Sequence, residues 1–169
     1  MESVTLRDVE PGDLSVFFEQ MRDPEAVQMA AFTAADPDDR QAFDRHWARI
    51  LGEPNILIKT VLVDGQVAGS VISYDQDADL EVSYWIDRAY WGQGVATQAL
   101  AKFLKIQTHR PLYGRAAKDN VGSVKVMLKN GFKIVGEDKG FANALGRENV
   151  ELVLMLAAED ESLQKQAKG

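Results

Sequence analysis

Two glycines one residue apart, Gly92 and Gly94, stand in the stretch YWGQGVAT at residues 90–97. A helix that begins just after such a turn leaves its first amide N–H groups without intrahelical partners, at the positive end of its dipole. These amides can bind a phosphate, because glycine allows an anion to approach the backbone closely. The spacing therefore predicts an anion site, to which Thr97 adds a hydroxyl. The structural alternative is a helix start that needs glycine only for its turn.

The residues around these glycines do not match the two common nucleotide-binding motifs. No third glycine follows at the dinucleotide spacing, and no Gly-Lys-Ser/Thr of a P-loop follows. Binding of NAD or of a mononucleotide is therefore disfavoured.

Other reactive side chains are few. The chain has no cysteine and two histidines, which excludes a thiolate nucleophile and predicts no metal site. We expect His46 on the polar flank of a helix and His109 at a helix end, and we favour neither as catalytic. Asp75, Asp77 and Asp79 could attract a cationic acceptor, but a solvated hairpin turn is the favoured interpretation.

The elements that must position these residues follow from hydrophobic periodicity. In the second helix predicted within residues 23–51, we expect the side chains that face the core to be Phe43, Trp47, Ile50 and Leu51. Asp64-Gly65 predicts a tight hairpin turn, and Asn130-Gly131 predicts a helix C-terminus. Residues 138–148 are expected to form a flexible connection. The predicted strands are 3–9, two runs within 55–74, 80–86, 112–117, 133–137 and 149–156, and the predicted helices lie within 11–23, 23–51, 94–109 and 120–132.

This order of elements predicts an α/β fold with a mixed, mostly antiparallel sheet of about six to seven strands flanked by helices. We expect one domain over residues 1–157 and a frayed tail over 158–169. The net charge of −7 disfavours nucleic acid as a partner. No apolar run is long enough for a membrane span and no leader is evident, so we expect a cytoplasmic protein.

The stretch YWIDRAYWGQGVATQAL, followed by RAAKDNVGSVKVMLKNGF, resembles the GNAT superfamily of acyl-CoA-dependent N-acyltransferases. Within it, the chain is similar to the branch of ribosomal-protein alanine and spermidine acetyltransferases. The specific match covers about residues 80–135. In the family's pyrophosphate loop, Trp91, Gly94 and Ala96 fill the patterned positions, with Trp91 departing from the usual Arg or Gln.

The resemblance implies acetyl-CoA as cosubstrate, with no metal. It implies that the fourth strand splays from the fifth, with a bulge near Ser83, to leave backbone groups for the pantetheine arm. Asn120 corresponds to the family's pantetheine-binding Asn. The implied cofactor-binding residues are Tyr84, Trp85, Ile86, Trp91, Gly92, Gln93, Gly94, Val95, Ala96, Thr97, Asn120, Ser123 and Lys129.

For catalysis, the resemblance makes Glu81 the candidate general base, with a solvated strand residue as the alternative. A backbone amide near Tyr84 is the implied oxyanion donor. Many relatives carry a Tyr acid seven residues after the Asn, but Met127 occupies that place here, which leaves Tyr84, Tyr113 or solvent to protonate the thiolate. The implied acceptor-binding residues are Met29, Phe32, Glu81 and Phe141.

We therefore expect an N-acetyltransferase in which a primary amine attacks acetyl-CoA directly in a ternary complex. The acceptor, whether a small molecule or a protein N-terminus, stays open, and a homodimer is possible. One alternative is a catalytically idle CoA-binding or regulatory module, which the missing Tyr favours. The other is a nucleotide-binding protein of a different fold.

Overall fold

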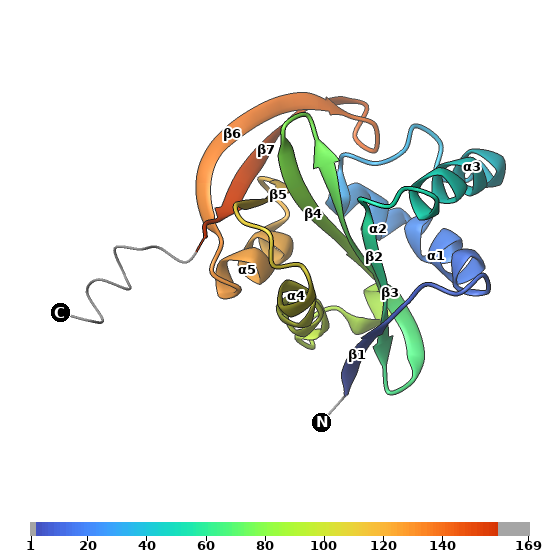
Figure 1. Cartoon of the computed structure of the whole chain (residues 1–169). Coiled ribbons are helices and arrows are strands. Elements are labelled where there is room, and N and C mark those ends of the chain that lie inside the picture. Colours follow the sequence, from blue (N-terminus) through green and yellow to red (C-terminus); the bar gives the residue numbers. More distant parts are fainter. Residues whose placement is uncertain (1–2, 159–169) are drawn as a thin grey trace.

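The computed structural model of the chain describes residues 3–158, and within this range seven strands form one sheet with helices on both faces (Figure 1). The expected frayed tail lies outside the described residues from residue 159 onward. The strands are β1 (Val4–Arg7), β2 (Leu57–Val63), β3 (Gln66–Gln76), β4 (Asp79–Ile86), β5 (Leu112–Ala117), β6 (Lys133–Ala142) and β7 (Arg147–Leu156). The helices are α1 (Asp13–Met21), α2 (Pro24–Ala30), α3 (Arg40–Leu51), α4 (Val95–Ile106), α5 (Val121–Lys129) and the single 3-10 turn η1 (Arg88–Tyr90).

The strand order in the sheet is β1-β2-β3-β4-β5-β7-β6. Every neighbouring pair is antiparallel except β4 and β5, which run parallel. This arrangement confirms the predicted mixed, mostly antiparallel sheet. It also places β4 and β5 near the middle of the sheet, where α4 connects one strand to the other.

The predicted hairpin between β2 and β3 turns at Asp64 and Gly65, which both have positive φ, 49° and 83°. Two positive φ angles are what a two-residue turn between twisted strands requires, and Asp-Gly supplies them at low cost. The next turn is shorter than the polar sequence suggests, because β3 and β4 stay paired as far as Gln76 and Asp79.

The main core lies between the sheet and α4 and α5. Its largest fully buried side chains include Phe103 and Leu100 from α4, Met127 from α5 and Phe132. On the opposite face, α1 and α3 pack against β2 and β3. The predicted inward positions of α3 are confirmed for Trp47 and Ile50, whereas Leu51 is 47% exposed at the end of the helix.

Three helices begin at side chains that accept hydrogen bonds from free helical amides. Asp23 caps α2, Asp39 caps α3 and Asn120 caps α5. Such caps satisfy backbone donors that the first turn leaves without partners, and each stabilises its helix by about 1 kcal/mol. The Asn120 cap therefore fixes where α5 starts.

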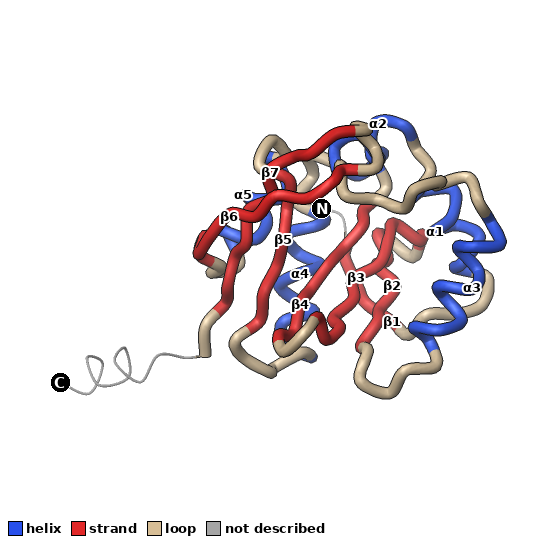
Figure 2. The backbone as a smooth tube through the Cα atoms, turned by 90° about the horizontal axis from the view of Figure 1, so that it is seen from above, coloured by secondary structure: helices blue, strands red, loops and turns tan. Residues whose placement is uncertain are grey.

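Two expectations about the strands are wrong. Residues 138–148 do not form a flexible connection, because β6 and β7 stay paired from Lys133–Met155 to Ala142–Arg147. Strand β6 is largely exposed, so its polar composition reflects solvent contact rather than absence of a strand. The tip of the β6–β7 hairpin lies beside α2 (Figure 2), and Gln28 Nε2 of α2 donates a 2.8 Å hydrogen bond to the Ala144 carbonyl of the tip.

The expected bulge near Ser83 is also absent, because β3 and β4 keep a continuous register from Gly69–Ile86 to Gln76–Asp79. Register shifts occur instead beside Val61 and Ile134. The strand that leaves β4 is β5, which remains fully paired with β7 on its other side. The separation of β4 from β5 therefore needs no extra residue in β4.

Candidate active site

The loop between η1 and α4 has the conformation that its glycines permit. Gly92 and Gly94 have φ angles of 75° and 77°, in the left-handed region that other residues rarely adopt. A side-chain carbon at Gly92 would meet no atom within 4 Å, and one at Gly94 would meet only the Gln98 side chain at 3.8 Å. The glycines are thus required by the backbone, and the space before them is open.

The first amides of α4 face this open space. Val95, Ala96 and Thr97 lie in the first turn, where helical amides have no intrahelical acceptor, and the first intrahelical bond of the next turn runs from Gln98 N to Gly94 O at 3.0 Å. No acidic side chain lies in this turn. The site is therefore suited to a phosphate or pyrophosphate group.

The gap between β4 and β5 begins just beyond two paired positions. Only Glu81–Tyr113 and Val82–Gly114 pair across these strands in the described part of the chain. Beyond them, β4 pairs only with β3 and β5 only with β7. The facing edges of residues 83–86 and 115–117 thus present backbone donors and acceptors to any extended amide group placed between them.

A cavity of about 510 Å³ joins this gap to the glycine loop. Tyr84 and Trp85 both line it, although neighbouring side chains on a strand point to opposite faces of the sheet. The cavity therefore passes the edge of β4 where β5 has separated from it. Its lining consists of Ala26, Met29, Ala30, Tyr84, Trp85, Ile86, Tyr90, Trp91, Gly92, Gly94, Val95, Ala96, Thr97, Asp119, Asn120, Val121, Gly122, Ser123, Lys125, Val126 and Lys129.

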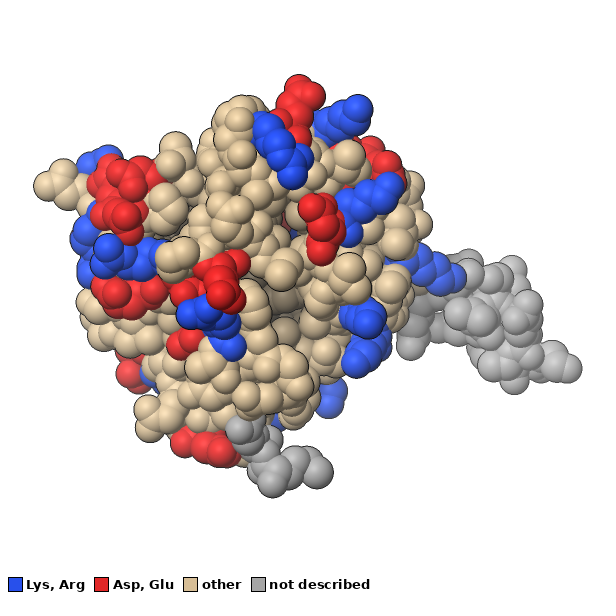
Figure 3. Space-filling model, turned by 180° about the vertical axis from the view of Figure 1, so that it is seen from behind, with Lys and Arg blue, Asp and Glu red and all other residues tan. Residues whose placement is uncertain are grey.

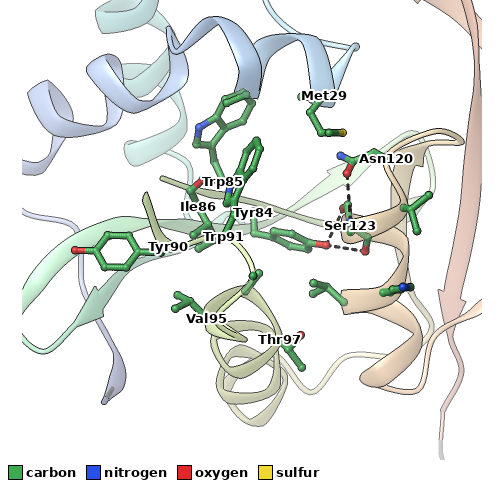
Figure 4. A pocket seen from close by; sticks show the side chains of 18 of the residues that line it. Met29, Tyr84, Trp85, Ile86, Tyr90, Trp91, Val95, Thr97, Asn120 and Ser123 are labelled. Atoms are coloured by element: carbon green, nitrogen blue, oxygen red, sulfur yellow. Dashed lines mark hydrogen bonds between the residues drawn. The ribbon is translucent and has the colours of Figure 1, made fainter. Parts of the chain in front are cut away.

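A short hydrogen-bond chain crosses the cavity from β4 to α5 (Figure 4). The Tyr84 hydroxyl lies 2.8 Å from Ser123 Oγ and 3.0 Å from the Ser123 carbonyl oxygen. Asn120 Oδ1 accepts a hydrogen bond from Ser123 N at 3.3 Å. Burial raises the pKa of Tyr84 to about 12, despite the opposing hydrogen bond to Ser123.

A charged cluster lies on the other face of the sheet at the same level. Arg115 Nε donates to Glu81 Oε1 at 2.7 Å, and Arg115 Nη1 donates to Glu151 and Asp138 at 3.1 Å and 3.2 Å. The hydrogen bond from Arg115 to Glu81 is the main cause that raises the pKa of the guanidinium, and burial raises the pKa of Glu151. Burial and the Glu81 charge raise the pKa of Tyr74 to about 12.

The wall of the cavity opposite α4 is α2, which is tied to η1 by ion pairs. Arg88 of η1 contacts Asp23 at 3.1 Å and Glu25 at 2.8 Å. Met29 extends from α2 toward the cavity (Figure 4). These ion pairs therefore hold η1 and α2 against each other.

The Acetyltransferase (GNAT) domain model matches residues 3–133 of the chain. The chain belongs to the GNAT acetyltransferase family. A search of curated proteins returns no match for this acetyltransferase. The residues that carry the sequence resemblance, the loop at Gly92–Thr97 and the segment after Asn120, meet at the cavity.

Solved structures share the fold of this acetyltransferase. Mycobacterium smegmatis RimJ, solved with CoA-disulfide, is 20% identical with a TM-score of 0.77, over 92% of this chain and 82% of that one. Vibrio cholerae spermidine N-acetyltransferase, solved with CoA and spermine, is 18% identical with a TM-score of 0.75, covering 91% and 95%. RimL, a ribosomal-protein acetyltransferase solved with coenzyme A, is 15% identical with a TM-score of 0.78, covering 93% and 95%.

Most of the residues assigned from the sequence to cofactor binding line one cavity of the acetyltransferase. Gln93 does not line it, because its side chain turns back to donate to the Ala89 carbonyl at 3.1 Å. Met29, assigned to the acceptor, lines the same cavity. Phe32 packs against a separate cluster with Ala117, and Phe141 is 62% exposed.

Glu81 lies outside the cavity lining and is buried in its ion pair with Arg115. The alternative of a solvated strand residue is therefore wrong. Sequence analysis missed the partner Arg115, because a strand residue's neighbour across a parallel pair cannot be found without the register.

Several lining residues of the acetyltransferase were not predicted. Ala26 and Ala30 come from α2, which carries no motif. Lys125 precedes Lys129 by four residues on α5, so both lysines lie on one helix face. The four-residue spacing of these lysines is the sequence pattern that could have predicted a basic helix face beside the cavity.

The face of the molecule in Figure 3 carries Lys and Arg next to Asp and Glu around a hollow near its centre. No helix in residues 3–158 is long and apolar enough to cross a lipid bilayer.

Proposed function

We propose that this acetyltransferase transfers the acetyl group of acetyl-CoA to a primary amine by direct attack in a ternary complex. The observation that carries the proposal is the cavity beside the β4–β5 gap, which side chains from both faces of β4 line. Such a passage lets a thioester bound from one face meet an amine that approaches from the other.

Acetyl-CoA fits the groups that surround the cavity. The free amides of Val95, Ala96 and Thr97 would hold the pyrophosphate, since they lie at the positive end of α4. The unpaired edges of β4 and β5 would bond the two pantetheine amides. Lys125 and Lys129 add positive charge on α5 for the remaining phosphate.

The reaction needs a neutral amine, a donor for the thioester oxygen and stabilisation of the leaving sulfur. We assign the base to Glu81, acting directly or through a water, because it faces the side of the sheet opposite α4 and α5. A backbone amide near Tyr84 would donate to the oxygen. The amine nitrogen bonds to the acetyl carbon, the C–S bond breaks, and the sulfur takes its electron pair.

No covalent intermediate is part of this proposal. The chain has no cysteine to accept the acetyl group, and an amine is nucleophilic enough to attack a thioester once it is deprotonated. Holding both reactants in one site replaces a bimolecular encounter with an oriented attack.

The similar structures act on two different classes of amine acceptor. One similar structure is a ribosomal-protein acetyltransferase and another is a spermidine acetyltransferase solved with spermine. A protein N-terminus and a polyamine are therefore the first acceptors to test, and an amino acid and an amine-bearing antibiotic are added as further classes of amine.

The test is amine-dependent release of CoA thiol from acetyl-CoA across a panel of short peptides, polyamines, amino acids and aminoglycosides. We expect at least one amine to raise thiol release well above the rate with acetyl-CoA alone. Mass spectrometry should find that the accepted amine gains the mass of one acetyl group in place of one hydrogen.

A CoA-binding module without activity is the second candidate, favoured by Met127, which is 2% exposed and packed in the core at the position where many relatives carry Tyr. It predicts thermal stabilisation by CoA without thiol release with any amine. Stabilisation by ATP or NAD rather than by CoA would instead support a nucleotide-binding protein.

A further inference from the structure

The proposed base Glu81 is held by an arginine from the neighbouring strand β5. Arg115 Nε donates to Glu81 Oε1 at 2.7 Å, and the Glu81 side chain is 8% exposed. A glutamate side chain has several rotatable bonds, so a charge-assisted hydrogen bond of this kind restricts where its carboxylate lies. A carboxylate has about four acceptor sites, and the bond from Arg115 therefore leaves Glu81 able to take a proton from an amine or a water.

Two tyrosines face the same carboxylate from the adjacent strands. Tyr74 of β3 lies opposite Glu81 in the antiparallel register, and Tyr113 of β5 lies opposite it in the parallel register. Burial and the Glu81 charge raise the pKa of Tyr74 to about 12, so Tyr74 stays neutral. The cation that pairs with Glu81 is therefore Arg115.

The guanidinium of Arg115 is itself fixed from two further strands. Its Nη1 donates to Glu151 of β7 at 3.1 Å and to Asp138 of β6 at 3.2 Å. Asp138 and Glu151 are cross-strand partners. Bonds at different edges of a planar group fix both its position and its plane, which the ammonium of a lysine on its flexible stem cannot reproduce. The position of the Glu81 carboxylate therefore depends on β5, β6 and β7 together.

The ion pair lies at the point where β4 and β5 separate. Glu81 and Val82 are the β4 residues that pair with β5 in the described part of the chain, opposite Tyr113 and Gly114. Arg115 is the next residue of β5 after these pairs. A carboxylate held by Arg115 is thus fixed relative to both edges of the gap where the thioester is proposed to bind.

The charged cluster is a costly way to stabilise a sheet. Three carboxylates share one guanidinium, and burial raises the pKa of Glu151. Buried ion pairs often stabilise a protein less than apolar side chains of similar volume do, because the charges lose their hydration. The cluster does, however, orient one carboxylate beside the gap, which is what a general base needs before it can accept a proton.

We propose that Arg115 is a positioning residue for the reaction, which holds the Glu81 carboxylate beside the β4–β5 gap in the orientation that takes the proton of the acceptor amine. This inference rests on the proposed function. The proton passes from the amine nitrogen to Glu81, directly or through one water, as the nitrogen bonds to the acetyl carbon. Glu81 returns the proton to solvent after the product leaves, and Arg115 neither gains nor loses one.

The first experiment measures kcat and KM with an aliphatic amine that the parent accepts and with an aromatic amine. Arg115→Ala should lower kcat for the aliphatic amine roughly hundredfold, because a displaced base loses its oriented geometry. Arg115→Lys keeps the charge without the planar fork and should lose roughly tenfold. The aromatic amine is already neutral and should be affected far less. KM for acetyl-CoA should stay within a few-fold of the parent, because Arg115 does not line the cavity.

A double variant and a matched control accompany these measurements. Arg115→Ala should cause no further loss when it is added to Glu81→Gln, because the base to be positioned is then absent. Lys118→Gln is the control, since Lys118 follows β5 directly and pairs with Glu137 of β6 at 2.9 Å on the exposed surface. Lys118→Gln removes a cation from another ion pair with β6 and should turn over both amines as the parent does.

Chemical rescue separates positioning from stability. The Arg115 side chain is 36% exposed, so a guanidinium ion from solution can enter the space that Arg115→Ala leaves. Millimolar guanidinium chloride, far below denaturing concentrations, should restore part of the aliphatic turnover of Arg115→Ala, whereas sodium chloride at the same ionic strength should not. The double variant with Glu81→Gln should show no rescue. Circular dichroism checks that each variant is folded, and Arg115→Lys decides the question if Arg115→Ala is not.

Parental kcat for the aliphatic amine in Arg115→Lys and Arg115→Ala would overturn the inference, as would equal losses with the two amines. A further loss when Arg115→Ala is added to Glu81→Gln would also overturn it. A parent that acetylates no amine refutes the proposed function, and the role of Arg115 falls with it. A parent that is active, with Arg115 variants that keep its turnover, refutes the role of Arg115 alone.

Discussion

At the scale of single residues, the anion site depends on Gly94, which is both left-handed and open to the cavity. Gly94→Asp adds a carboxylate and side-chain bulk where the pyrophosphate is proposed to lie. We expect CoA affinity to fall more than tenfold, which is more than ~1.4 kcal/mol. Isothermal titration with CoA measures this change.

Gly92→Asp is not a suitable control, since Gly92 belongs to the same loop. Gly12→Asp, on the surface before α1 and with nothing within 4 Å, carries the same new charge far from the cavity. It should bind CoA as the parent does. Equal CoA affinity in Gly94→Asp and the parent would place the phosphates elsewhere.

The proposed role of Glu81 as the general base can also be tested by a substitution. Glu81→Gln keeps the shape of the side chain. If Glu81 is the base, turnover of a high-pKa amine at pH 7 should fall by ~10²–10⁴-fold while acetyl-CoA binding stays normal. Steady-state kinetics with an aliphatic amine and with an aromatic amine, which is already neutral, measures the contrast.

The alternative is that Glu81 has only a structural role, because it is buried and forms an ion pair with Arg115. In that case Glu81→Gln should lower the melting temperature and affect both amines alike. Turnover of the aliphatic amine within a few-fold of the parent, with an unchanged pH profile, would exclude Glu81 as the base.

At the scale of elements, the spacing of β3 and β4 determines where the cavity-lining strand lies. Gly69 lies directly against β4, and a side-chain carbon there would lie 1.9 Å from the Trp85 carbonyl oxygen. Gly69→Ala must therefore push the two strands apart. We expect a loss of at least ~2 kcal/mol in unfolding free energy, measured by urea denaturation.

The same displacement moves Trp85 and Ile86, so CoA binding should weaken together with stability. Gly136→Ala on β6 is the matched control, because a side-chain carbon there meets nothing within 4 Å. It should change stability by less than ~0.5 kcal/mol. Parent-like stability in Gly69→Ala would mean that β3 can adapt.

At the scale of the whole molecule, Asp13 joins β1, α1 and β2. Its carboxylate accepts hydrogen bonds from Arg7 at 2.7 Å and from the Thr60 hydroxyl at 2.8 Å, and it is 4% exposed. The Arg7 hydrogen bond is the main cause that lowers the pKa of Asp13 from 3.8 to about 2. The charged form is therefore stabilised by folding.

A lowered pKa means that this stability is fully present above pH ~4 and is lost as pH falls toward 2. The contribution is about 2 kcal/mol. Urea denaturation at pH 6 and at pH 2.5 should therefore find a smaller loss in Asp13→Asn than in the parent. Equal losses would mean that Asp13 is as acidic unfolded as folded.

The sequence by itself determined the elements with strong local signals. Asp64-Gly65 and the 3.6-residue period of α4 predicted their turn and helix, because backbone conformation and amphipathic burial are properties of short segments. The same holds for Gly92 and Gly94, whose left-handed conformation follows from residue type. The family motif around them located most of the cavity lining.

Only the tertiary structure decided what depends on pairing between distant segments. Arg115 meets Glu81 because β4 and β5 share a two-residue parallel register. The β6–β7 hairpin is long because the exposed strand β6 and its neighbour β7 satisfy each other's backbone groups. Tyr84 reaches Ser123 because α5 starts at its Asn120 cap beside the gap. The contacts of Arg115 with Glu81 and of Tyr84 with Ser123 join residues more than thirty positions apart, and no local pattern specifies the distance between them.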